Sequence, residues 1–93
     1  MEYEIKAGDI VLSKAGRDCG RYFVVLRTEE NFAFVCDGDL RKADSPKRKK
    51  FKHLINTGKC AEFALNKINN EEKLTNAELR REIQEFSEKI DFL

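Results

Sequence analysis

Two strand-length apolar runs joined by a glycine-bracketed loop stand near the start of the chain, at residues 8–25, GDIVLSKAGRDCGRYFVV. The run at residues 9–13 is short and β-branched, and the run at residues 22–26 is nearly continuous in apolar residues, as is typical of strands. Gly16 and Gly20 bracket the loop, and glycine supplies the positive φ or close backbone approach that a tight connection needs. The stretch predicts a pair of strands whose connecting loop is basic.

Further strands are predicted downstream at similar spacing. Residues 32–36 form another apolar run, which follows a plausible hairpin loop at residues 29–31 and ends at the turn signal Asp37-Gly38. Residues 41–44 are expected to form a fourth strand, with a break near Pro46, and residues 51–55 a fifth. Five short strands at roughly ten-residue spacing predict a small antiparallel barrel.

The remaining sequence predicts two helices. Thr75 and Glu78 form a capping box, and Leu74 with Leu79 forms the matching hydrophobic staple, so a helix is expected over residues 76–89. Its apolar stripe consists of Leu79, Ile83, Phe86 and Ile90. An earlier helix is expected from near residue 58 to residue 67 or 68, although residues 63–65 are also compatible with a strand. Packing of both stripes against the barrel or each other is favoured over a partner-binding coiled coil.

The charge is unevenly distributed along the 93 residues. The chain is 38% charged and has 18 Lys and Arg against 17 Asp and Glu, a net charge of +1. Residues 1–58 carry a net charge of +3 and residues 59–93 a net charge of −2, and residues 41–53 alone reach +6. Near-neutrality therefore conceals a basic segment, which indicates a polyanionic partner for one part of the chain.

Several classes of protein are disfavoured. The length fits one domain and excludes a large multidomain enzyme, and the longest apolar runs have five residues, too few for a transmembrane helix. Residues 1–4 are MEYE, acidic where a signal peptide is basic, so a cytoplasmic protein is expected. No nucleophile or acid–base constellation stands out, so no enzyme activity and no cofactor are predicted.

The cysteines allow one sharper alternative. Cys19, Cys36 and Cys60 together with His53 supply enough ligands for a zinc ion. Structural zinc sites usually contain closely paired ligands, however, and these cysteines are 17 and 24 residues apart. Ordinary reduced thiols are therefore favoured over a metal site.

Residues 8–38 resemble a KOW motif, the strand–loop–strand element of SH3-like barrels in translation proteins. Gly20, followed by Tyr22, Val24 and Val25, occupies the place of the motif's glycine and second strand. The continuation through residues 37–49 is similar to that of small bacterial KOW-domain RNA-binding proteins and of large-subunit ribosomal proteins with a KOW barrel and a helical extension. The resemblance implies an SH3-like barrel over residues 1–56, a helical extension over residues 57–93, and binding to ribosomal or other structured RNA, with ribosomal proteins as further partners.

The predicted RNA-binding residues are the basic side chains of the glycine-bracketed loop and of the basic segment. They are Lys14, Arg17, Arg21, Arg41, Lys42, Lys47, Arg48, Lys49, Lys50 and Lys52. Phe51, within the basic segment, is expected in the core more than in a stack with an unpaired base. KOW motifs also occur in transcription elongation factors, where the barrel can bind protein. A protein-interaction module that docks on a transcription or translation assembly through the barrel or the helical tail is the alternative.

Overall fold

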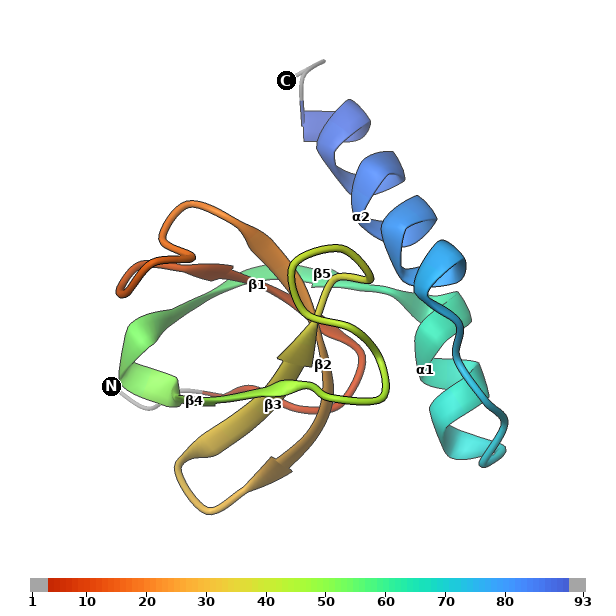
Figure 1. The fold of residues 1–93 in the computed structure, drawn as a ribbon, viewed down its shortest axis with the longest axis horizontal. Coiled ribbons are helices and arrows are strands. Elements are labelled where there is room, and N and C mark those ends of the chain that lie inside the picture. The colour runs from red at the N-terminus through yellow and green to blue at the C-terminus, as the bar shows by residue number, and fades with distance from the viewer. Residues whose placement is uncertain (1–3, 91–93) are drawn as a thin grey trace.

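Five strands precede two helices in the computed structural model, which describes residues 4–90 (Figure 1). The elements are β1 (Asp9–Ser13), β2 (Tyr22–Glu29), β3 (Phe32–Cys36), β4 (Lys47–Lys50), the 3₁₀ turn η1 (Phe51–His53), β5 (Leu54–Cys60), α1 (Glu62–Asn69) and α2 (Asn76–Ile90). The predicted order of a small mainly-β unit followed by two helices is confirmed.

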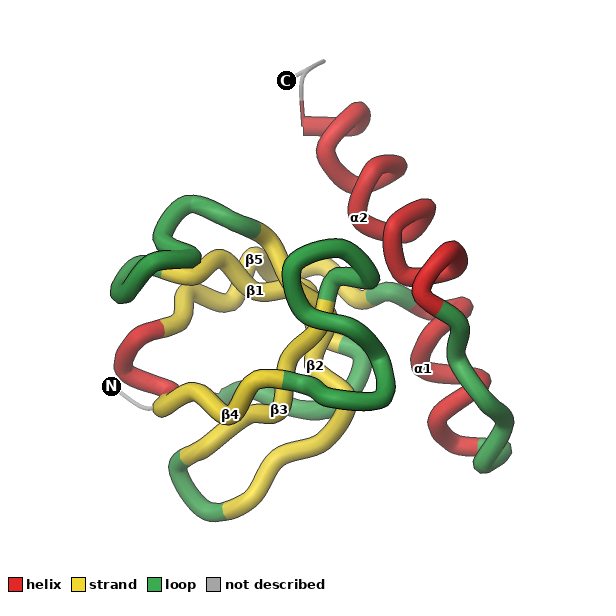
Figure 2. Tube along the Cα trace, in the orientation of Figure 1, coloured by secondary structure: helices red, strands yellow, loops and turns green. Residues whose placement is uncertain are grey.

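All neighbouring strands are antiparallel, and their order in the sheet is β4-β3-β2-β1-β5. The sheet is open: β4 and β5 are its two edges, and η1 connects them along the chain. The strands curve around one another on one side of the molecule, while the two helices stand together on the other side (Figure 2).

The predicted strand at residues 41–44 is wrong, because this segment is a loop. Asp37 Oδ1 accepts hydrogen bonds from the backbone N–H groups of Asp39 and Arg41, and the Arg41 carbonyl accepts those of Asp37 and Gly38. These local bonds engage backbone groups that a ladder would need. The fourth strand instead begins directly after Pro46, in the basic run itself.

The fifth strand also differs from its predicted position. Residues 51–53 form η1, and β5 then pairs with β1 from Leu54 opposite Ser13 to Cys60 opposite Asp9, with an irregularity between Asp9 and Val11. The strand therefore continues through Gly58, so the first helix begins at Glu62 and not near residue 58.

Two apolar clusters lie on opposite faces of the sheet, because successive side chains of a strand alternate between faces. The inner cluster consists of Ile5, Val11, Phe23, Val25, Ala33, Val35 and Leu54. The outer cluster combines Ile10, Val24 and Cys36 of the sheet with Ala61, Ala64, Leu74, Leu79 and Phe86 of the helical region. The helices thus cover one part of the outer face and share a core with the strands.

The start of α2 follows the predicted capping box. The Glu78 carboxylate accepts the Thr75 N–H at 3.0 Å, and the Glu78 N–H donates to the Thr75 hydroxyl at 3.1 Å. Leu79 and Phe86 are buried against the sheet and Ile83 packs beside them, so the apolar stripe is used within the fold. The side chain of Ile90 lies outside the described part of the structure.

Candidate nucleic-acid interface

A buried ion pair joins the β1–β2 loop to β4. Lys49 Nζ lies 2.8 Å from Asp18 Oδ1 and donates to the Ala15 carbonyl at 3.0 Å, while the Ser13 hydroxyl donates to the same Asp18 oxygen at 2.8 Å. Burial by itself would raise the pKa of Asp18, but the hydrogen bonds from Lys49 and Ser13 outweigh it and hold the pKa below its ordinary value. Lys49 is only 7% exposed. It was predicted to contact RNA, but the structure places it as the link between the two basic segments.

The other cations of the basic run line the edge of the sheet. In the β3–β4 register Arg48 is opposite Phe34 and Lys50 opposite Phe32, so both side chains share the outer face with these rings. Lys47 at the start of β4 and Lys52 in η1 are exposed as well. We call these four residues, Lys47, Arg48, Lys50 and Lys52, the basic edge. No carboxylate lies in the sequence between them.

The cations of the β1–β2 loop divide into two groups. Lys14 and Arg17 are exposed, and the Lys49 link holds their loop next to β4. Arg21 instead donates through Nη2 to Asp37 at 2.9 Å and to Asp39 at 3.0 Å. The guanidinium of Arg21 is therefore partly occupied by internal carboxylates.

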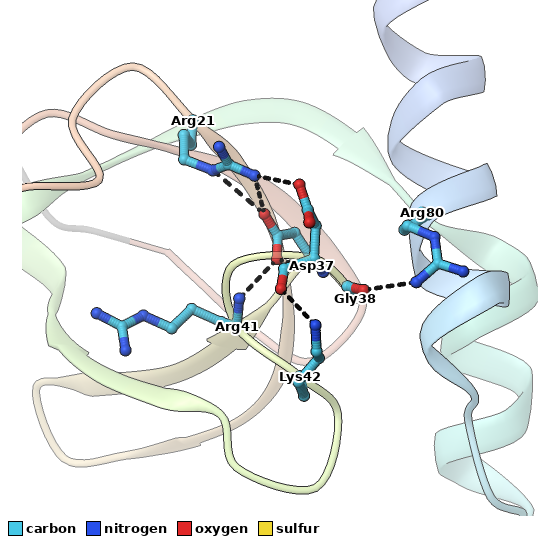
Figure 3. A network of polar contacts seen from close by, with 7 residues as sticks. Arg21, Asp37, Gly38, Arg41, Lys42 and Arg80 are labelled. Carbon is cyan, nitrogen blue, oxygen red and sulfur yellow. Dashed lines mark hydrogen bonds and ion pairs between the residues drawn. The ribbon is translucent and has the colours of Figure 1, made fainter.

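The turn after β3 contains Arg41 and Lys42, the last two predicted cations, and Figure 3 shows its contacts: the backbone N–H of Arg41 and the side chain of Lys42 are hydrogen-bonded within the turn. Burial would raise the pKa of Asp37, but the N–H groups of Arg41 and Asp39 and the guanidinium of Arg21 lower it below its ordinary value. Lys42 Nζ donates to the Asp39 carbonyl at 2.7 Å, and Arg41 is half-buried. This network favours a structural role for the side chains of Arg21 and Lys42 alongside any contact with a ligand, whereas Arg41 takes part through its backbone.

Helix α2 fixes this turn from the other side. Arg80 Nη1 donates to the Gly38 carbonyl at 2.7 Å (Figure 3). The Asn76 side-chain oxygen accepts the Ala43 N–H at 2.7 Å. Gly38 has a φ of +80°, and a Cβ at this position would collide with the Asn76 carbonyl. The helical region therefore positions the loop that leads into β4.

The structure adds three residues that were not selected from the sequence: Arg27, Phe32 and Phe34. Arg27 lies opposite Phe34, and its guanidinium carbon is 3.9 Å from the centre of that ring. The Arg48 guanidinium carbon is 3.5 Å from the centre of the Phe32 ring. The spacing of Phe32 and Phe34 two residues apart in β3 was the available signal, because it places both on one face. Arg27 was not predictable, because its position depends on a register shift between Val25 and Arg27.

A hollow of about 560 Å³ adjoins this face at the end of β4. It is lined by Asn31, Phe32, Lys50, Phe51 and Lys52. Phe51 is half-buried and packs against the inner cluster, in agreement with its expected place in the core. One wall of the hollow is thus aromatic, and two of its lining residues belong to the basic edge.

The zinc alternative is not assembled in the structure. Within residues 4–90 no three His, Cys, Asp or Glu side chains lie close enough together to hold a metal ion. Cys36 is buried, which raises the pKa of its thiol to about 12, whereas Cys19 and Cys60 are exposed.

Neither helix in the described residues has the length and apolar character to cross a bilayer.

Comparison with models of known protein families gives no match, and comparison with curated protein sequences gives none. The resemblance of residues 8–38 to a KOW motif therefore stays a prediction. The functional argument depends on the geometry of the basic edge, the β1–β2 loop and the neighbouring aromatic face.

Proposed function

We propose that this protein binds RNA without catalysing a reaction, and that the basic edge is its principal contact with the phosphate backbone. The observation that carries the proposal is the alignment of four exposed cations, Lys47, Arg48, Lys50 and Lys52, along one strand edge and the adjoining turn. Lys and Arg side chains attract phosphates regardless of sequence and release condensed counterions on binding. Such contacts position a backbone, and base recognition requires additional groups.

The β1–β2 loop extends this surface. The Lys49–Asp18 pair fixes the loop against β4, and Lys14 and Arg17 add two exposed cations to those of the basic edge. The arrangement supports the bipartite surface predicted from sequence, with Lys49 as its internal link. Arg21, Arg41 and Lys42 shape the adjoining turn.

We further propose that the sheet is an SH3-like barrel of the KOW type. Sequential strands are neighbours throughout β1 to β4, and β5 returns to pair with β1. The inner cluster draws side chains from β1, β2, β3 and β5, which supports a sheet rolled around one interior. By resemblance, the proposed ligand is ribosomal RNA or another structured RNA in the cytoplasm, with ribosomal proteins as neighbours.

The protein-interaction alternative rests on the apolar stripe of α2. Leu79 and Phe86 are buried in the outer cluster, so in the described part of α2 this stripe is covered by the sheet. The observation that would have favoured docking through α2 is therefore lacking, and the RNA proposal is preferred.

A charge-reversal pair tests the proposal. The variant Lys47→Glu/Arg48→Glu/Lys50→Glu is compared with the control Lys59→Glu/Lys73→Glu/Arg81→Glu, which changes the net charge equally at exposed positions away from the basic edge. Binding to a fluorescein-labelled RNA stem-loop is measured by anisotropy, after circular dichroism has verified that both variants fold. We expect the first variant to lose at least about tenfold in affinity and the control to lose much less, because electrostatic contacts supply most non-specific binding. Equal losses, or no binding by the unmodified protein, would contradict the proposal.

A further inference from the structure

We propose that the outer face of β2, β3 and β4 is a stacking platform for unpaired bases of a single-stranded RNA segment. This inference rests on the proposed function and deepens it, because it names the form of RNA that the site selects. Its central residues are Arg27 on β2, Phe32 and Phe34 on β3, and Arg48 on β4, which are neighbouring strands.

An arginine guanidinium lies over the ring of Phe32 and another over the ring of Phe34. Arg27 lies over Phe34 and Arg48 over Phe32, with guanidinium carbons 3.9 and 3.5 Å from the ring centres. Both rings are half-buried, whereas both arginine residues are exposed. The planar guanidinium groups therefore form the outer layer of two short stacks, with the aromatic rings beneath them.

An arginine held in this way suits a nucleobase. Unstacked RNA bases stack on guanidinium planes and on aromatic rings. This stacking accepts any base, because every base has a π-face. The N–H groups at the edge of the same guanidinium remain able to donate to phosphate oxygens. Lysine retains the charge but lacks the plane, which makes the arginine-to-lysine change informative.

The charge of this face also favours an anionic strand. Within the paired strands, Arg27, Arg48 and Lys50 share the face with the carboxylate of Glu29, which is opposite Phe32 in the register. Glu30 lies in the turn beyond it. Beside Arg27, Asp44 and Glu72 line a further hollow together with Lys73. The positive charge of the face is therefore concentrated on β4, at Arg48 and Lys50.

The hollow beside Phe32 provides a second place for a base. Its volume of about 560 Å³ lies within the range of small-molecule sites. Phe32 and Phe51 give it an apolar lining, and Lys50 and Lys52 lie beside them. An RNA strand that runs along β4 would thus contact the Phe32 ring covered by Arg48 and then the hollow with its aromatic lining. Cations of the basic edge lie beside both places.

The experiment compares a short single-stranded oligouridine with the same backbone carrying abasic sites. The abasic strand retains the phosphates and lacks the bases, so the ratio of the two affinities isolates stacking. We expect the unmodified protein to prefer the oligouridine by about tenfold or more, as base stacking on such side chains warrants. Affinities are measured by fluorescence anisotropy at one fixed salt concentration.

The double variant Arg27→Lys/Arg48→Lys supplies the decisive comparison. It keeps the net charge and the apolar content of the strands, so we expect it to bind the abasic strand as the unmodified protein does and to lose the preference for bases. The control Arg81→Lys, at an exposed position of α2, should keep that preference.

Three results would overturn the inference in distinguishable ways. Equal affinity of the unmodified protein for both strands would remove the stacking platform and leave RNA binding through the basic edge intact. Polyglutamate bound as tightly as oligouridine would show a general polyanion site without base recognition. No binding to the oligouridine or to the stem-loop RNA would remove the proposed function together with this inference.

Discussion

Replacing Lys49 by methionine is expected to destabilise the fold far more than replacing the exposed cation next to it. Lys49 and Asp18 are 7% and 3% exposed and their charged atoms are 2.8 Å apart. Removing one partner of a buried pair leaves an uncompensated charge, at a cost of about 3–5 kcal/mol. The Ser13 hydroxyl remains to donate to Asp18, so we expect a loss at the lower end, about 3 kcal/mol. Methionine keeps an unbranched side chain of similar reach.

Urea denaturation followed by circular dichroism measures this loss. The matched control is Lys50→Met, one residue further along β4 and exposed, for which a change within about 0.5 kcal/mol is expected. For a domain of this size the Lys49→Met variant should also melt roughly 12–24 °C lower. If Lys49→Met costs less than about 1 kcal/mol, or no more than Lys50→Met, the ion pair does not hold the β1–β2 loop to β4.

The pH dependence of the free energy of unfolding provides an independent test of the Lys49–Asp18 pair. The pKa of Asp18 is lowered in the folded protein, so the pair contributes stability above the ordinary carboxyl pKa of about 3.9 and loses it as the pH falls through the folded value. The difference in unfolding free energy between the unmodified protein and Lys49→Met should therefore be largest near neutral pH and shrink below about pH 4. Asp18→Asn in the Lys49→Met background should recover part of the loss, because it removes the unpaired carboxylate.

Other perturbations test the supporting structure. Gly38→Ala should destabilise the fold by at least about 2 kcal/mol in chemical denaturation, because it combines a φ of +80° with a collision at the start of α2, whereas Gly20→Ala, with a φ of +91° and open space around it, should cost only about 1 kcal/mol. Equal costs would show that the contact with α2 is not maintained. Thr75→Ala should lower the unfolding free energy by about 1 kcal/mol through loss of the capping bond, and an unchanged value would argue against the box. Under native conditions a thiol reagent should modify Cys19 rapidly and Cys36 only on unfolding, since Cys36 is buried and its thiol pKa is about 12; rapid labelling of Cys36 would contradict this packing.

Local patterns were sufficient wherever a segment's structure depends on its own residues. The apolar runs at residues 9–13 and 32–36 became β1 and β3 with the predicted bounds. The capping box at Thr75 set the start of α2, because both hydrogen bonds join residues three positions apart. The glycine-bracketed loop likewise connects two paired strands, since Gly16 and Gly20 adopt positive φ values.

Predictions failed where distant residues decide the structure. The basic run at residues 47–50 has no alternating pattern, yet it forms a strand because it pairs with β3 and buries Lys49 against Asp18, which is 31 residues away. Residues 41–44 were predicted as a strand and are instead held in a loop by Asp37 and by α2.

The candidate site divides in the same way. The exposed cations of the basic edge were identified from local charge density, a property of the sequence alone. The internal role of Lys49 and the stacking of Arg27 on Phe34 depend on strand register, which no short segment of sequence specifies.

The salt dependence of RNA binding tests the central proposal most directly. For the unmodified protein and a single-stranded RNA, the logarithm of affinity should fall linearly with the logarithm of salt concentration, with a slope of about −3 if the four cations of the basic edge each meet a phosphate. The Lys47→Glu/Arg48→Glu/Lys50→Glu variant should show a much shallower slope. A flat salt dependence of the unmodified protein, or a slope that the variant leaves unchanged, would contradict RNA binding through the basic edge.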